Sequence, residues 1–216
     1  DDDDVALRGS ACGPLLLPNR ELVTLDLEFV VHATQVDVDH VFLSEMNPEA
    51  LCEGFDRVEP NVQLGYTPDD IARGRSIMQK LQLDNAILDV KAAVAVLAPV
   101  GKIGIVGYCW GGLLTWRAAA LVQGLSAAVP YYGGGTTTEQ EIARHPNCPV
   151  MAHYAKEDHW IGLDTVEAFA KAHPEVTVHL YDADHGFNCD HRGSYQKASA
   201  DLARERTLAF LEEHLA

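Results

Sequence analysis

The chain of 216 residues carries little positive charge and has no long apolar run. Lysine and arginine number 16 against 32 aspartates and glutamates, which gives a formal net charge of −16. So acidic a chain disfavours nucleic acid and anionic membrane surfaces as partners, because both are negatively charged. No segment approaches the roughly 18 apolar residues of a membrane span, and Asp1–Asp4 are the reverse of a basic signal-peptide start. These absences predict a cytoplasmic protein.

Cysteine is scarce and irregularly placed. The five cysteines are an odd number at no regular spacing: Cys12, Cys52, Cys109, Cys148 and Cys189. The pattern argues against a disulfide framework and against paired Cys-x-x-Cys zinc ligands, and it suits a reducing compartment. Histidine and cysteine gather in His185–His191, but no second ligand pair stands at the spacing of a zinc site. We therefore expect no bound metal.

Apolar residues make up 47% of the chain, enough for one sizeable core, and we expect a single domain over residues 1–216. Strand-like and helix-like segments alternate, which predicts an α/β fold with a mostly parallel sheet and helices on both faces. Strands are expected at 22–27, 102–106, 127–132, 149–154 and 176–181, and helices at 67–81, 87–97, 165–172 and 194–214. Residues 29–55 show no clean helical or strand period.

A nucleophile elbow is the most informative motif. A β-branched run ends in a Gly-x-Cys-x-Gly turn at residues 107–111 and leads into a helical pattern. Such a turn holds its central residue on a strained corner between strand and helix, where the flanking glycines avoid clashes. A thiol at the start of a helix also gains thiolate character from the helix dipole. Cys109 is thus the predicted nucleophile, although a buried cysteine with a purely structural role is the alternative.

A thiol nucleophile needs a histidine, and the histidine needs a carboxylate that fixes its tautomer. Asp158 follows the predicted strand 149–154, and His185 follows the predicted strand 176–181. The order Cys, Asp, His along the chain is the order of the α/β hydrolases. The neighbouring acidic and histidine side chains that could take these roles instead are Glu157, His159, Asp184 and His191.

The chain resembles the dienelactone hydrolase (carboxymethylenebutenolidase) family over roughly residues 54–216. The resemblance rests on the segments Gly107–Gly112, Lys156–Ile161, His185–Asp190, Gly193–Tyr195, Ala203–Leu208, Tyr131–Gly135 and Leu64–Pro68. It implies an α/β-hydrolase fold in which Cys109, His185 and Asp158 form a catalytic triad. A cysteine in the elbow is unusual among α/β hydrolases, which makes the match specific.

The resemblance also implies roles for residues around the thiol and the substrate. By position, Glu28 would contact the resting thiol, and the backbone N–H groups of Phe29 and Trp110 would form the oxyanion hole. The alternative is that Glu28 is an exposed surface acid. Arginines hold the substrate carboxylate in family members that act on dienelactone. The candidates for that role here are Arg73, Arg75 and Arg192. The alternative is that all three are ordinary surface arginines.

The resulting expectation is a hydrolase that needs no cofactor and opens unsaturated lactones or related activated esters through an acyl-enzyme on Cys109. Its partner would be that small-molecule substrate, and the protein would be a monomer or a small homo-oligomer. Two alternatives remain: a non-catalytic relative in which Cys109 senses oxidants, and a thioesterase or carboxylesterase that uses the same site. The complete Cys–His–Asp set argues against a sensor, because a sensor needs no Asp–His pair.

Overall fold

The computed structural model describes residues 22–25, 29–33, 67–69, 72–73, 76, 82–190 and 192–216. Its described strands form one six-stranded sheet in the order β1-β2-β3-β4-β5-β6. Their bounds are β1 Leu22–Leu25, β2 Phe29–Ala33, β3 Ile103–Tyr108, β4 Leu125–Tyr131, β5 Met151–Ala155 and β6 Thr177–Tyr181. The order in the sheet is therefore the order in the chain.

The sheet has a parallel part and an antiparallel edge. Strands β3 to β6 run parallel to one another, and the connections between them carry helices. Strands β1 and β2 form an antiparallel pair, and β2 also runs antiparallel to β3, with Phe29 opposite Gly107. The carboxyl ends of parallel strands lie at the same end of the sheet, so the loops that follow β3, β5 and β6 come together there.

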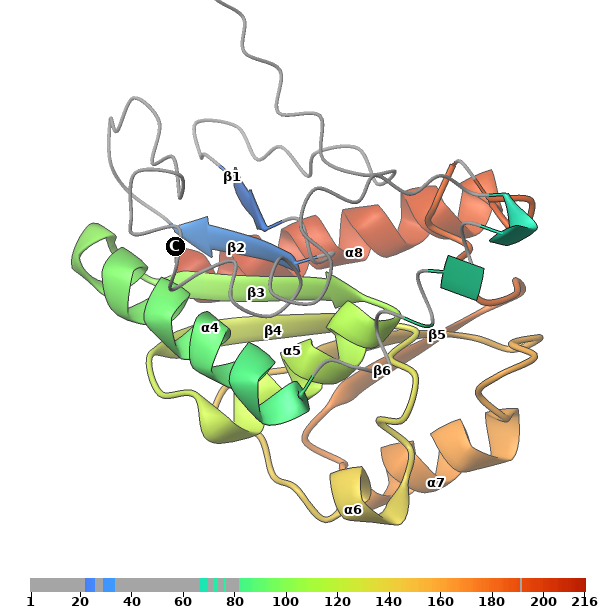
Figure 1. Ribbon diagram of the computed structural model, residues 1–216, viewed down its shortest axis with the longest axis horizontal. Helices are drawn as coiled ribbons and strands as arrows, with labels where there is room; N and C mark the ends of the chain where they lie inside the picture. The colour runs from blue at the N-terminus through green and yellow to red at the C-terminus, as the bar shows by residue number, and fades with distance from the viewer. Residues whose placement is uncertain are drawn as a thin grey trace, which may run out of the picture.

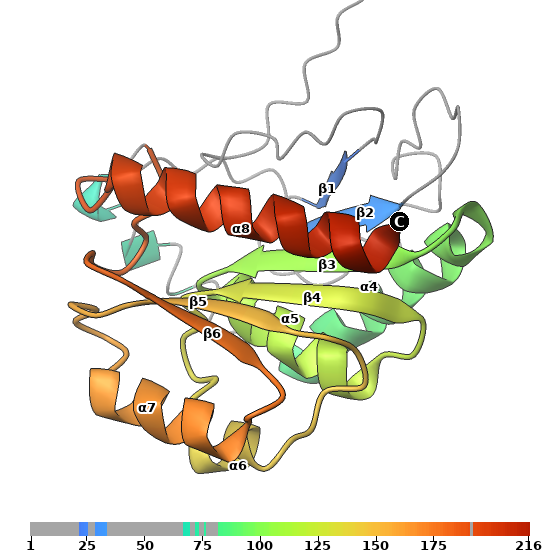
Figure 2. The same ribbon diagram turned by 180° about the vertical axis from the view of Figure 1, so that it is seen from behind.

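Helices cover both faces of the sheet (Figures 1 and 2). Helices α4 and α5 lie on one face, and α8 crosses the other, where it stands in front of the strands in Figure 2. The bounds are α4 Leu83–Leu97, η2 Ala98–Val100, α5 Trp110–Leu121, α6 Glu139–Ile142, α7 Leu163–Ala172 and α8 Lys197–Leu215. No helix in the described part of the chain is both long and apolar enough to span a membrane.

The core lies between these layers and is rich in aromatic side chains. The largest fully buried aromatic residues are Trp116, Tyr131, Tyr154, Phe169 and Phe187. The ring of Trp116 on α5 packs edge-on against Phe169 on α7, with centroids 4.9 Å apart, so the two helices share one apolar layer. On the other face, Thr207 of α8 hydrogen-bonds the Tyr131 hydroxyl of β4 at 2.6 Å.

The expected α/β fold with a mostly parallel sheet is confirmed. The strand expected at 22–27 is β1, which covers Leu22–Leu25. Within residues 29–55, for which the sequence shows no clean period and predicts no element, Phe29–Ala33 forms β2. A strand enclosed between two partners gains its stability from backbone pairing, which hydrophobic periodicity does not report. Helix α8 begins at Lys197, three residues after the predicted start at 194.

Candidate active site

The turn at Cys109 has the tight backbone geometry of a nucleophile elbow. Cys109 stands between β3 and α5 with φ 54° and ψ −114°, a conformation that side chains rarely adopt. Its N–H donates to the Tyr131 carbonyl at 3.0 Å, and its carbonyl accepts from the N–H of Leu113 at 3.2 Å. A Cβ on Gly107 would lie 2.2 Å from the Gly111 carbonyl oxygen, so the turn closes only with glycine there.

Three side chains from three loops form one continuous hydrogen-bonded chain. His185 Nε2 lies 3.1 Å from Cys109 Sγ, and His185 Nδ1 lies 2.7 Å from Asp158 Oδ2. The second carboxylate oxygen of Asp158 accepts the N–H groups of Trp160 at 2.9 Å and Ile161 at 3.0 Å. Asp158 is thus fixed by its own loop and presents a single oxygen to the imidazole.

The proton affinity of His185 follows from these neighbours. Burial would lower the pKa of His185, but hydrogen bonds to Asp158 and Cys109, together with the charges of these two groups, outweigh it and raise the pKa to about 9. The ring therefore carries a proton on both nitrogens at neutral pH. The imidazole of His185 thus lies between a carboxylate and a sulfur atom, the order of groups that a cysteine nucleophile requires.

Aromatic rings enclose the histidine. The Trp160 ring centroid lies 4.6 Å from that of His185, and the Tyr132 centroid lies 5.1 Å from it. Tyr132 has a positive φ of 35°, and Trp160 is 50% exposed. One ring is therefore buried behind the imidazole, while the other offers a flat apolar surface to solvent beside it. Neither residue stands out in the sequence as a site residue, although the paired tyrosines of 131–132 form a visible motif.

The described acids and histidines that competed for the triad roles take other positions. Asp184 Oδ1 accepts the backbone N–H of His185 at 2.6 Å and contacts Nδ1 of His159 at 2.7 Å. It therefore shapes the histidine loop without contacting the His185 ring nitrogens. Glu157 is exposed, and His191 lies outside the described residues. Among the described carboxylates, Asp158 is the one hydrogen-bonded to the imidazole of His185.

Comparison with known proteins decides the family. Residues 34–215 match the dienelactone hydrolase family. The chain belongs to this family. A carboxymethylenebutenolidase of Pseudomonas sp. strain P51 is 28% identical over 188 residues, which are 79% of this chain and 78% of the relative. A candidate carboxymethylenebutenolidase of Escherichia coli K12 is 35% identical over 129 residues, 53% of this chain and 47% of that protein.

Solved structures show the same fold. The crystal structure of a candidate dienelactone hydrolase from Klebsiella pneumoniae superposes with a TM-score of 0.64 at 24% identity, covering 86% of this chain and 92% of that one. A dienelactone hydrolase-like promiscuous phosphotriesterase, P91, gives a TM-score of 0.55 at 17% identity, covering 73% and 72% of the two chains. The α/β-hydrolase fold expected from the sequence is thus confirmed for this dienelactone hydrolase family member.

The remaining predicted site residues have different outcomes. Trp110 begins α5, so its N–H belongs to the first turn, where backbone donors have no partner within the helix. The backbone of Phe29 lies opposite Gly107, two residues before the elbow cysteine. Glu28 and Arg75 lie outside the described residues. Arg73 is exposed.

Arg192 lies beside the histidine loop. A Cβ built on Gly186 would meet the Arg192 side chain at 3.1 Å from Cδ and 3.2 Å from Nη1. Gly186 has φ +78° and directly follows His185, so its missing side chain leaves room for the arginine there. Of the three arginines predicted to bind substrate, Arg192 is therefore the one that the structure places next to the candidate site.

Proposed function

We propose that this protein is a cysteine-dependent hydrolase that opens lactones, or cleaves related activated esters, through an acyl-enzyme on Cys109. The observation that carries the proposal is the continuous chain from Cys109 Sγ through His185 to Asp158, with contacts of 3.1 and 2.7 Å. Membership in the dienelactone hydrolase family supports the substrate class.

In the first half-reaction, the Cys109 thiolate adds to the substrate carbonyl carbon and forms a tetrahedral oxyanion. The Trp110 N–H, at the positive end of α5, is the oxyanion donor, with Phe29 as the proposed second donor. Collapse of the intermediate breaks the carbon–oxygen ester bond, and His185 Nε2 gives its proton to the departing oxygen. The products of this step are a thioester on Cys109 and a free hydroxyl or enol group.

In the second half-reaction, His185 is neutral and removes a proton from a water molecule. The resulting hydroxide attacks the thioester, the carbon–sulfur bond breaks, and the imidazolium–thiolate pair is restored as the acid product leaves. Asp158 remains ionised throughout, because its role is to hold Nδ1–H and to stabilise the positive ring.

Hydrolysis of p-nitrophenyl acetate and of a dienelactone tests the proposal. Cys109→Ala removes the nucleophile, so kcat is expected to fall by at least about 10³-fold for both substrates. Cys148→Ala is the matched control, because Cys148 is a half-buried cysteine outside the hydrogen-bonded chain of the candidate site. Wild-type turnover by Cys109→Ala would refute the proposed nucleophile. If the wild-type protein hydrolyses p-nitrophenyl acetate but not the dienelactone, the substrate class is activated esters and not lactones.

The position of Arg192 supports a role in binding an anionic group of the substrate. A planar guanidinium beside the His185 loop can hold a carboxylate through two hydrogen bonds. Arg192→Met is expected to raise KM for a carboxylate-bearing lactone while KM for a neutral ester stays unchanged. Arg204→Met, an exposed arginine on α8, is the control. Equal effects on both substrates would show that Arg192 has no such role.

A further inference from the structure

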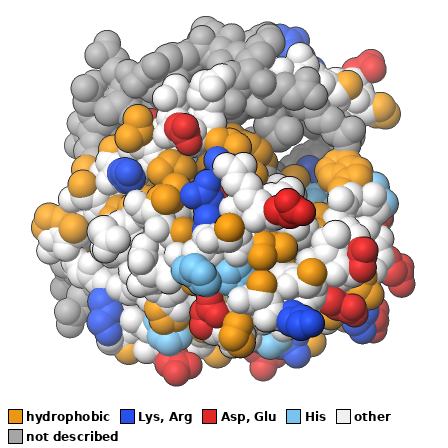
Figure 3. All heavy atoms as spheres, turned by 90° about the horizontal axis from the view of Figure 1, so that it is seen from below, with side chains coloured by type: hydrophobic (Ala, Val, Ile, Leu, Met, Phe, Trp, Pro, Cys, Tyr) orange, Lys and Arg blue, Asp and Glu red, His pale blue; other side chains and the backbone are white. Residues whose placement is uncertain are grey.

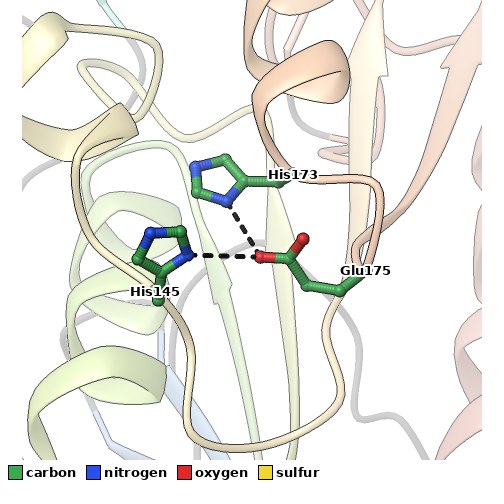
Figure 4. A group of neighbouring side chains, drawn as sticks. All are labelled: His145, His173 and Glu175. Carbon is green, nitrogen blue, oxygen red and sulfur yellow. Dashed lines mark hydrogen bonds and ion pairs between the residues drawn. The ribbon is translucent and has the colours of Figure 1, made fainter.

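A second group of chemically active side chains lies outside the candidate active site. His145, His173 and Glu175 each offer one ligand atom, and these atoms lie within 4.8 Å of one another. The two imidazole rings face the same carboxylate (Figure 4). Histidine side chains next to acidic ones are also visible on the face of the molecule drawn in Figure 3.

The hydrogen bond made by His173 decides which of its nitrogens is available. Its Nε2 lies 2.9 Å from the carbonyl oxygen of Ile142. A carbonyl oxygen only accepts, so Nε2 carries a proton and donates it there. In the neutral ring Nδ1 then holds a lone pair, and Nδ1 lies 3.1 Å from Glu175 Oε1. Two electron-rich atoms at this distance need a cation between them, either a proton or a metal ion.

The buried position of His173 prepares it for such a role. Its side chain is 0% exposed and is packed edge-on to Trp116, with centroids 4.9 Å apart. A histidine metal ligand commonly donates its other N–H to a backbone carbonyl, which fixes the tautomer and the orientation of the ring. The bond to Ile142 provides that arrangement here.

The spacing of Glu175 Oε1 from each histidine nitrogen suits a small tetrahedral ion. Zinc bonds of about 2.0–2.2 Å to nitrogen and oxygen place neighbouring ligand atoms of a tetrahedron roughly 3.3 Å apart. Glu175 Oε1 lies 3.1 Å from His173 Nδ1 and 3.6 Å from His145 Nδ1. The side chains of His145 and Glu175 are 77% and 45% exposed, so water can reach the remaining position.

We propose that His145, His173 and Glu175 form a binding site for a divalent transition-metal ion of the Zn²⁺ class, with water as the fourth ligand. Two imidazoles and one carboxylate favour zinc, cobalt or nickel over calcium and magnesium, which prefer oxygen ligands. The three residues come from the segment between α6 and β5 and from the segment between α7 and β6. A bound ion therefore links two separate loops.

The location indicates a stabilising role and not a part in ester hydrolysis. The linked loops precede β5 and β6, whereas Asp158 and His185 follow these same strands. The ion would thus bind at the amino-terminal ends of the parallel strands, whereas the candidate active site lies at their carboxyl-terminal ends. An ion that binds the folded chain but not the unfolded one raises the melting temperature in proportion to the logarithm of its free concentration.

Isothermal titration of the full chain with ZnCl₂ tests the proposal. Cys109→Ser is the background for every sample, because the thiol and His185 could otherwise bind zinc themselves. One ion per chain is expected. His145→Ala and Glu175→Gln are each expected to weaken zinc binding at least about tenfold. Both side chains are largely exposed, at 77% and 45%, so these substitutions leave the core intact. Glu167→Gln, an exposed acid on α7, and His214→Ala are controls that retain it.

Two further readouts separate a metal site from a shared proton. At a free zinc concentration one hundred times Kd, the melting temperature is expected to rise by roughly 5 °C or more, and this rise disappears in His145→Ala. Cobalt should give the visible absorption of a tetrahedral site without a sulfur charge-transfer band. Zinc binding that is absent, or that persists unchanged in both His145→Ala and Glu175→Gln, would overturn the proposal and leave a proton-linked ion pair.

Discussion

At the scale of single residues, Asp158 sets both the orientation and the proton of His185. Its Oδ1 is held by two backbone N–H groups of its own loop, so Oδ2 alone faces His185 Nδ1. In Asp158→Asn the amide oxygen can keep the loop contacts, but the amide NH₂ then faces Nδ1. The neutral ring is driven to the tautomer with its proton on Nε2, which cannot accept a proton from thiol or water.

Asp158→Asn is therefore expected to lower kcat by roughly 10³–10⁴-fold. It is also expected to lower the melting temperature at neutral pH, because Asp158 is a partner that raises the pKa of His185. Steady-state kinetics alongside thermal unfolding measure both quantities. Glu157→Gln, on the exposed neighbouring acid, serves as the control and should leave kcat unchanged. An Asp158→Asn protein that turns over like wild type would transfer the orienting role to another group.

The raised pKa of His185 makes a further prediction about stability. The folded state binds the His185 proton with a pKa of about 9, against an ordinary value of 6.5. The proton therefore stabilises the folded state fully below pH 6.5, and this contribution, up to about 3 kcal/mol, is lost as the pH rises through 9. His185→Gln has no such proton at any of these pH values.

Urea unfolding of wild type and of His185→Gln at pH 6 and at pH 9.5 measures this contribution. The difference in the free energy of unfolding between the two proteins is expected to be larger in favour of wild type at pH 6 than at pH 9.5. A difference independent of pH would mean that the imidazole is neutral in the folded state throughout this range.

At the scale of elements, the elbow depends on the close approach of α5 to the end of β3. A Cβ on Gly107 would lie 2.2 Å from the Gly111 carbonyl oxygen and 2.3 Å from Thr115 Oγ1. Gly107→Ala is expected to lower the free energy of unfolding by about 3 kcal/mol or more and to abolish hydrolysis, because backbone must move. Gly134→Ala is the control, since a Cβ there meets no atom within 4 Å.

Thermal unfolding and turnover of the two alanine variants decide this prediction. Loss of stability in Gly107→Ala alone supports the elbow geometry. Equal stability of both variants would contradict it, because the turn would then accommodate a side chain at residue 107.

The elements that the sequence predicts best are those in which local signals and tertiary packing agree. Ile87, Val90, Val94 and Leu97 are spaced three and four residues apart, and all four are buried on α4. The elbow cysteine can also be predicted from the sequence, because the glycines around it are required by local steric contacts. Strand β2 carries no such signal, since its pairing with β3 joins residues 70 to 78 positions apart in the sequence.

At the scale of the whole molecule, the parallel strands separate two chemical sites. Cys109, Asp158 and His185 follow β3, β5 and β6 at one edge of the sheet, while the cluster of His145, His173 and Glu175 precedes β5 and β6. The triad order could be predicted because it follows strand order in an α/β hydrolase. The second cluster could not, because its residues stand at no motif spacing and meet only after folding.

The environments of the described cysteines differ across the molecule. Cys109 is half-buried and lies 3.1 Å from the His185 ring. Burial raises the pKa of Cys148 to about 11, and Cys189 is buried. A thiolate reacts with alkylating agents far faster than a thiol, so these differences predict selective modification of the elbow cysteine.

Alkylation by iodoacetamide at neutral pH, with peptide mapping of all five cysteines at successive times and residual hydrolysis measured in the same samples, tests the central claim most directly. Cys109 is expected to be carbamidomethylated first, and activity should fall in proportion to the fraction of Cys109 modified. Loss of hydrolysis while Cys109 remains unmodified, or full hydrolysis after its complete modification, would contradict the assignment of Cys109 as the nucleophile.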